Sequence, residues 1–459
     1  MKRLALLIFI GLCAFEKSLA QERPNIILIN IDDMGWKDLG VFGSDYYETP
    51  FLDSLAKEGL IFKQAYAAAS NCAPSRASML TGLWNTRHQM YTVSSSERGD
   101  AKDRKIIPIK NTLFLDKKFE TFPQILQKIG YETIHAGKWH ISPDPRDFGF
   151  KESIGGGPEG APRNFYPPYG IRNWEGPEED YLTDAIMTKT IARMNSVQAP
   201  FFLYYSPYAV HTPIQGKPGL AKKYVNKFSS LGQNNADYAS MIENLDRNIA
   251  LLFKSLQEKN QLQNTLIIFT TDHGGLKGIT SQPPLRSGKG SYYEGGIRVP
   301  FFMVWQDKIK PGVNETSVIT QMDLFPTLMD LLGEKSTAEL DGESLIPLIF
   351  ENQTLPPRSL YWHFPIYLQA YAVEDDGIRD PLFRTRPGSV IRQGDWKLHY
   401  YFEDQDVELF NLKDDIAEQT DLSNQHPEKV KELMSLLQAW WAKTEAPIPS
   451  QPNPEFKSN

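Results

Sequence analysis

Short apolar runs alternate with amphipathic stretches over the first two thirds of the chain. The run 25–31, which follows Pro24, is apolar almost throughout and predicts a strand buried on both faces. Strands that alternate with helices predict an α/β fold with a large, mixed, mostly parallel sheet flanked by helices. The other predicted strands cover residues 131–136, 201–205 and 265–269, and the predicted helices begin at Pro50 and cover 122–129 and 238–257.

The pattern changes near residue 350. Four short runs, near residues 360–362, 389–391, 397–401 and 407–410, predict antiparallel strands, and 425–443 has helical spacing. We therefore expect a catalytic domain over residues 21–350 and a smaller C-terminal α+β domain with an antiparallel sheet over residues 351–459.

The N-terminus has the pattern of an export signal. It begins Met-Lys-Arg, continues with an apolar run at 4–15 and ends with small residues before Gln21. This pattern predicts a signal peptide over residues 1–20 and a secreted or periplasmic protein. The run is too short to span a bilayer comfortably, so we expect no membrane span. Residues 10–13 resemble a lipoprotein box only loosely, which makes a lipid anchor the less favoured interpretation.

The formal net charge of −7 argues against nucleic acid as a partner. An anionic substrate would therefore need a local cluster of cations. Residues 155–176 are rich in Gly, Pro and aromatic side chains and predict a long surface loop, a kind of segment that is often functional.

Carboxylates follow two of the predicted strands. Asp32 and Asp33 come directly after the first strand, and the pair Asp272 and His273 follows a later one. Binding sites in parallel sheets gather at the carboxyl ends of the strands. An Asp-Asp pair after a strand is also common as a turn or helix cap, so the pair alone does not define a site.

Cys72 is the only cysteine outside the predicted signal peptide, since the other is Cys13. An internal disulfide is therefore excluded for the mature chain. A lone cysteine is commonly a small buried hydrophobe. Pro74 suits the first turn of a helix, which would put Cys72 at a helix N-terminus, where free amide groups favour anions.

The surroundings of Cys72 carry a resemblance to a known family. Residues 72–82 read Cys-Ala-Pro-Ser-Arg-Ala-Ser-Met-Leu-Thr-Gly, and residues 130–140 read Gly-Tyr-Glu-Thr-Ile-His-Ala-Gly-Lys-Trp-His. Both resemble signatures of the sulfatases, and the blocks at 285–290 and 294–300 resemble further family blocks. The resemblance covers about residues 22–350 and implies the sulfatase fold of the alkaline-phosphatase superfamily.

The resemblance implies roles for residues in the first two blocks. Cys72 would be oxidised to formylglycine, whose hydrated aldehyde is the nucleophile, and Arg76 would hold its oxyanion. Lys138 would contact the sulfate, while His140 would hydrogen-bond the nucleophile and assist the release of sulfate. Lys138 and His140 lie two residues apart, so an extended segment would direct both to the same side.

Two further residues complete the implied machinery. Lys289 would be a second sulfate-binding cation, and His211, in a His-Thr-Pro sequence, would be the acid that protonates the leaving oxygen, with Lys289 as a possible helper. For any single Lys or His a solvated surface position is the more common interpretation. Their occurrence in family blocks, in the family's order, favours the functional one.

The resemblance also implies a metal site. Asp32, Asp33, Asp272 and His273, together with the residue derived from Cys72, are the candidate ligands, and carboxylate-rich ligation suits Ca²⁺ better than Zn²⁺. The metal would polarise a sulfate oxygen and lower the pKa of the nucleophile. Many family members have Asn at the position of His273, although some have His.

These features predict an exo-acting carbohydrate sulfatase, leaning toward galactose or N-acetylgalactosamine sulfates. A sulfated saccharide and a formylglycine-generating enzyme are the expected partners. The alternatives are a phosphonate or phosphate ester hydrolase of the same superfamily and a non-catalytic sulfated-glycan-binding protein with unconverted Cys72. The segments 166–174, 362–367 and 379–386 could line a sugar pocket, though each could equally be packing.

Overall fold

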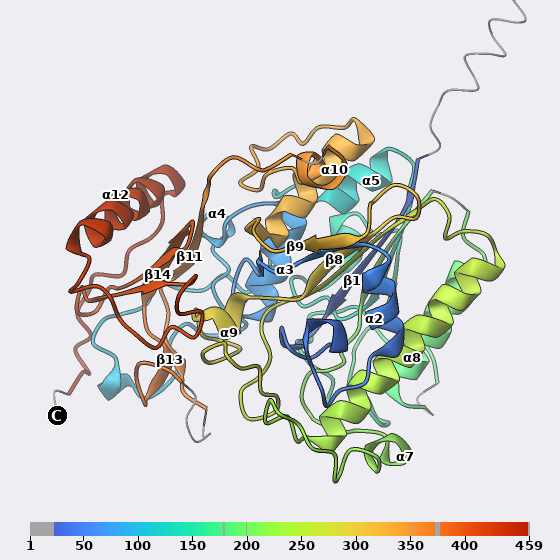
Figure 1. Cartoon of the computed structure of the whole chain (residues 1–459), viewed down its shortest axis with the longest axis horizontal. Helices are drawn as coiled ribbons and strands as arrows, with labels where there is room; N and C mark the ends of the chain where they lie inside the picture. Colours follow the sequence, from blue (N-terminus) through green and yellow to red (C-terminus); the bar gives the residue numbers. More distant parts are fainter. Residues whose placement is uncertain (1–22, 178–179, 199, 352, 372–376, 458–459) are drawn as a thin grey trace, which may run out of the picture.

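The computed structural model describes residues 23–177, 180–198, 200–351, 353–371 and 377–457. Within these residues the N-terminal part forms an eight-stranded sheet (Figure 1). The strands from β5 to β7 run parallel, as do β2 and β9, whereas β8 is antiparallel to both of its neighbours. Their order is β5 (Glu152–Ile154), β4 (Glu132–Gly137), β6 (Phe201–Ser206), β1 (Asn25–Ile31), β7 (Thr265–Thr271), β8 (Phe301–Val304), β2 (Leu60–Phe62) and β9 (Gly312–Asn314).

Helices cover both faces of this sheet, which explains why its central strands are so apolar. In β1, Ile27, Ile29 and Ile31 belong to one hydrophobic core, and Ile26 and Leu28 belong to the other. The first core is completed by α2 (Pro50–Lys57), α6 (Leu182–Met194) and α8 (Ala236–Glu258), and the second by α3 (Cys72–Thr81), α5 (Phe122–Lys128) and α10 (Leu324–Leu332).

A second, antiparallel sheet forms near the C-terminus (Figure 1, orange to red). It is covered by α12 (Pro427–Thr444), whose Leu433 and Leu437 pack against Val390 and Leu398. The same core includes Tyr66 from the N-terminal part, which lies outside the eight-stranded sheet, so the C-terminal sheet packs against side chains of the N-terminal part. The strands are β11 (Ser359–Phe364), β14 (Gly388–Gln393), β15 (Trp396–Tyr401) and β16 (Val407–Asn411).

The remaining elements are short. Strands β12 and β13 form an antiparallel pair beside the C-terminal sheet, and β3 pairs with β10. These elements are β3 (Ala65–Tyr66), β10 (Ile319–Thr320), β12 (Leu368–Gln369), β13 (Phe383–Thr385), α4 (Asn85–His88), α7 (Pro218–Ala221), α9 (Glu294–Ile297), α11 (Ile346–Phe350) and the 3-10 helices Gly40–Phe42, Ala101–Asp103, Pro145–Phe148 and Gln321–Asp323.

The expected fold class is confirmed: a mostly parallel sheet flanked by helices and a smaller antiparallel sheet. The expected surface loop at 155–176 has neither helix nor strand, but it is not wholly on the surface, because Phe165 and Tyr169 are buried in the first core. The signal peptide predicted at 1–20 lies outside the described residues, and the domain limits at 350 and 351 stay a prediction. No helix in the described ranges combines the length and apolar character needed to cross a membrane.

Candidate active site

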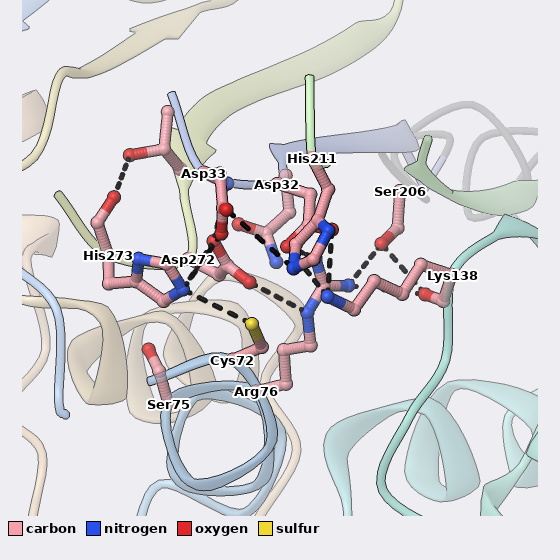
Figure 2. A network of polar contacts seen from close by, with 12 residues as sticks. Asp32, Asp33, Cys72, Ser75, Arg76, Lys138, Ser206, His211, Asp272 and His273 are labelled. Atoms are coloured by element: carbon pink, nitrogen blue, oxygen red, sulfur yellow. Dashed lines mark hydrogen bonds and ion pairs between the residues drawn. The ribbon is translucent and has the colours of Figure 1, made fainter. Parts of the chain in front are cut away.

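Four adjacent parallel strands end beside one another and bring the predicted residues together (Figure 2). Asp32 and Asp33 follow β1, and Asp272 and His273 follow β7. Lys138 follows β4, the neighbour of β6. The carboxyl ends of parallel strands share one edge of a sheet, so residues far apart in the sequence converge here.

Cys72 is the first residue of α3 and faces this edge. Its side chain is buried, and its Sγ lies 3.2 Å from Nε2 of His273. Burial alone would raise the pKa of the Cys72 thiol, but the ammonium groups of Lys138 and Lys289 outweigh it and hold that pKa well below its usual value. The prediction that Cys72 begins a helix is confirmed, and Pro74 lies in the first turn.

Three buried carboxylates, one histidine and the thiol form the metal candidate. One ligand atom from each of Asp32, Cys72, Asp272 and His273 lies within 4.8 Å of the others. Asp33 forms a second such group with Cys72 and His211, and its Oδ1 is 3.3 Å from Nε2 of His273.

His273 is oriented as a metal ligand would be. Its Nδ1 lies 2.9 Å from the carbonyl oxygen of Gly274, which can only accept, so Nδ1 carries the proton and donates it. Nε2 therefore keeps its lone pair in the neutral ring, and it points toward Cys72 and the carboxylates (Figure 2). This second contact fixes the tautomer in the way typical of metal-binding histidines.

The pKa values of two of these carboxylates shift in opposite directions. Burial raises the pKa of Asp32 well above its usual value, with Asp272 acting in the same direction and Lys138 against it. Asp272 differs: burial is outweighed by His273 and Arg76, which lower its pKa to about 2. Hard oxygen ligands at this density are the donor set that Ca²⁺ prefers.

Each predicted cation contacts a carboxylate in this structure. Lys138 Nζ lies 2.7 and 2.8 Å from the oxygens of Asp32, and Lys289 Nζ lies 2.6 and 2.8 Å from those of Asp33. Arg76, on α3, donates from Nε to Asp272 at 3.1 Å and is buried, which excludes the interpretation of a surface arginine. Direct contact of Lys138 and Lys289 with sulfate stays a prediction.

The segment from Lys138 to His140 is not extended, so that expectation was wrong. His140 has φ +71°, a value outside the extended region. His140 nevertheless hydrogen-bonds Cys72. Burial lowers the pKa of His140 to about 4 although this bond opposes the shift, so the ring is neutral near pH 7.

His211 and Lys289 form a direct pair. Nε2 of His211 lies 3.0 Å from Nζ of Lys289 and 3.6 Å from a carboxylate oxygen of Asp33. Nδ1 of His211 donates to the carbonyl oxygen of Thr212 at 2.7 Å, because that oxygen can only accept. In the neutral ring, Nε2 therefore accepts a hydrogen bond from Nζ of Lys289.

The sequence interpretation missed the residues that hold Arg76. Its Nη1 donates to Ser206 Oγ, to the carbonyl oxygen of Lys138 at 3.1 Å and to Tyr204 at 3.4 Å. Ser206 also donates to that carbonyl, at 2.9 Å. The signal was available: Ser206 follows an apolar run as directly as Asp32 does.

The comparisons with known proteins agree with this fold and site. A family model described as Sulfatase matches residues 24–334, and the chain belongs to that family. A second model, described as N-sulphoglucosamine sulphohydrolase, C-terminal, matches residues 288–443. The protein is therefore a sulfuric ester hydrolase, which favours the enzyme over the non-catalytic glycan-binding interpretation.

Two curated relatives and one solved structure illustrate the similarity. A sulfatase of Formosa agariphila is 30% identical over 93% of this chain and 90% of its own length. Human N-acetylgalactosamine-6-sulfatase is 30% identical over 75% of this chain and 69% of its own. The crystal structure of Ps i-CgsB matches with a TM-score of 0.76 and 28% identity over 91% of this chain and 93% of that one.

Proposed function

We propose that this protein hydrolyses sulfate monoesters on saccharides, using a formylglycine made from Cys72 and a bound Ca²⁺. The observation that carries the proposal is the convergence on Cys72 of three buried carboxylates, His273 and the cations Lys138 and Lys289. Carboxylates suit a divalent cation, and cations suit the oxygens of a sulfate.

The residues divide the work as follows. Asp32, Asp33, Asp272 and His273 would hold the metal, which, together with the hydrated aldehyde at position 72, supplies an activated hydroxyl nucleophile and a polarised sulfate oxygen. Burial would raise the pKa of Asp272, but His273 and Arg76 together lower it, and the 3.1 Å contact from Arg76 holds Asp272 in position. The site is buried, so fixed charges act more strongly than they would in water.

Lys289 and His211 serve the leaving oxygen. His211 would deliver the Nε2 proton of its protonated ring to the leaving oxygen, beside Lys289 at 3.0 Å. Lys289 keeps its own proton, because burial, which would lower its pKa, is outweighed by Asp33, which raises that pKa well above the usual value. The charge of Lys289 therefore stabilises the leaving oxygen. His140, neutral and hydrogen-bonded to residue 72, is suited to accept a proton from the nucleophile when sulfate is released.

The relatives support a saccharide as the leaving group. Several mammalian N-acetylgalactosamine-6-sulfatases are 29–31% identical to this chain. Ps i-CgsB has also been crystallised in complex with a neocarrahexaose. These names favour galactose or N-acetylgalactosamine sulfate as the substrate. The export predicted from the N-terminal sequence would agree with action on a polymeric glycan.

The test is sulfate release by protein produced together with a formylglycine-generating enzyme. We expect turnover of a sulfated galactose or N-acetylgalactosamine, and faster hydrolysis of an aryl sulfate than of the matching aryl phosphate. Faster hydrolysis of the phosphate would favour the phosphate or phosphonate ester alternative and overturn the proposal. The phosphonate monoester hydrolase of Agrobacterium radiobacter shares the fold at 20% identity, with a TM-score of 0.67, which makes this comparison necessary.

A further inference from the structure

The backbone on either side of Lys289 is held by residues of the C-terminal part of the chain. Nη1 of Arg384 donates to the carbonyl oxygen of Lys289 at 2.8 Å, and Thr385 Oγ1 donates to the carbonyl oxygen of Gly290. Arg384 and Thr385 both belong to β13. The short pair β12–β13 therefore lies directly against the proposed active site.

Arg384 also fixes Tyr371. The guanidinium lies over the Tyr371 ring, and its Nη2 donates to the carbonyl oxygen of Gln369, two residues before Tyr371, at 3.2 Å. Arg384 is itself buried, with 7% of its surface exposed. A guanidinium over an aromatic face is a favourable arrangement, so the ring has a rigid support on one side.

Arg384 places Tyr371 beside the backbone of Lys289. The guanidinium that lies over the Tyr371 ring also donates to the carbonyl oxygen of Lys289 at 2.8 Å. Tyr371 is only partly buried, and within the described part of the chain its hydroxyl has no hydrogen-bond partner. It thus offers a supported ring, and a hydroxyl that no described residue bonds, beside the proposed sulfate-binding lysine.

The positions of His211, Lys289 and Tyr371 indicate which part of the substrate would contact the Tyr371 ring. His211 would contact the leaving oxygen, and Nζ of Lys289 lies 3.0 Å from its Nε2. Arg384, which lies over the Tyr371 ring, contacts the backbone of the same Lys289. A group next to the leaving oxygen belongs to the alcohol and not to the sulfate. In a saccharide this alcohol is a pyranose ring, which has C–H groups for an aromatic face and hydroxyls for a phenol.

We propose that Tyr371, supported by Arg384, contacts the pyranose ring that carries the sulfate and is a specificity residue of the enzyme. This inference rests on the proposed saccharide sulfatase function. The ring of Tyr371 packs against the sugar, and its hydroxyl bonds a sugar hydroxyl. A supported aromatic side chain loses little conformational freedom when it binds, which makes it an effective contact.

The experiment measures kcat/KM for the wild type, Tyr371→Ala and Tyr371→Phe. The substrates are galactose 6-sulfate, N-acetylgalactosamine 6-sulfate and the sulfated monosaccharide that the wild type hydrolyses fastest in a wider panel. Tyr371→Ala should lower kcat/KM by about tenfold or more, as expected for loss of an aromatic contact. Tyr371→Phe should lower it by about two- to tenfold, the scale of one hydrogen bond.

Product inhibition separates a sugar contact from mere support of Lys289. Inorganic sulfate occupies only the sulfate position, so its inhibition constant should stay within about twofold in both variants if Tyr371 contacts the sugar. A matched control is Tyr400→Ala, since Tyr400 is a partly buried tyrosine of β15 that packs against Phe402 and Trp441. This control should leave kcat/KM unchanged.

Two results would overturn the inference while the saccharide sulfatase function stands. One is an unchanged kcat/KM in Tyr371→Ala. The other is an inhibition constant for sulfate that rises in parallel with the loss of kcat/KM, which would assign Tyr371 to positioning Lys289. A wild-type protein that releases sulfate from no member of the panel would instead contradict the proposed function itself.

Discussion

The ammonium nitrogen of Lys138 lies 2.7 and 2.8 Å from the two carboxylate oxygens of Asp32, and both side chains are fully buried. Asp32 is also a candidate metal ligand. If Asp32 binds a metal cation, that cation and the ammonium of Lys138 therefore act on the same two oxygens. Coulomb interactions at such distances are strong in a buried site, so lysine and metal should be energetically coupled.

Replacing Lys138 with methionine should make the protein less stable and more dependent on calcium. Breaking a buried ion pair from one side costs about 3–5 kcal/mol, because a charge is left without a partner. Bound Ca²⁺ would supply that missing charge. Thermal unfolding with and without Ca²⁺ should therefore show a larger calcium-induced rise in Tm for Lys138→Met than for the wild type.

Lys429→Met is the matched control for this experiment, because Lys429 pairs with Glu432 at the surface of α12. An exposed pair contributes little, so both Tm and its calcium response should match those of the wild type. An equal calcium response in Lys138→Met and the wild type would contradict the coupling.

Asp33→Asn should abolish most of the calcium response. Asp33 has φ +60°, a conformation that Asn also tolerates, so this change removes the charge without straining the backbone. If the site binds Ca²⁺, saturation at about 100 times Kd stabilises the wild type by about 2.7 kcal/mol, and the variant should lose most of that gain. Differential scanning calorimetry over a calcium titration measures both proteins.

The exposed residue Asp307, with φ +58°, provides the control substitution Asp307→Asn. It has the same backbone conformation but lies outside the cluster, so its calcium response should equal that of the wild type. A calcium response retained in full by Asp33→Asn would contradict a contribution of the Asp33 charge to Ca²⁺ binding.

Cys72→Ala should remove turnover and leave the fold intact. The side chain shortens by one sulfur atom, whereas the proposed nucleophile is lost, so kcat should fall by about a thousandfold or more. Activity assays with circular dichroism of the same sample measure both properties. Mass spectrometry of the tryptic peptide 64–76 from active wild-type protein should show residue 72 as formylglycine; active protein with an unmodified thiol would refute the proposed nucleophile.

His211→Ala should lower kcat/KM most for substrates with poor leaving groups. A general acid contributes about 10²–10⁴-fold when the leaving oxygen needs a proton. A sugar alkoxide needs that proton, whereas 4-nitrophenolate is a good leaving group without it. The loss of kcat/KM should therefore be much larger on a sulfated monosaccharide than on 4-nitrophenyl sulfate, and equal losses on both would argue against His211 as the acid.

The strands could be predicted because their signal is local. In β1, Ile27, Ile29 and Ile31 face one core while Ile26 and Leu28 face the other, and burial on both sides leaves an apolar run that is visible in the sequence. The segments 362–367 and 155–176 were harder to interpret. The sequence does not distinguish an aromatic side chain that lines a pocket from one that packs in a core. Trp362 and Tyr367 proved to be core residues, 1% and 0% exposed.

The sequence by itself determined the elements, the block around Cys72 and the residue types of the site, since these depend on neighbours along the chain. Only the tertiary structure decided the pairings: Lys138 with Asp32, Lys289 with His211, and Arg384 with Tyr371. These contacts depend on the order β4-β6-β1-β7 and on the place of β13 against Lys289. That order is fixed by packing between segments far apart along the chain, which no local pattern records.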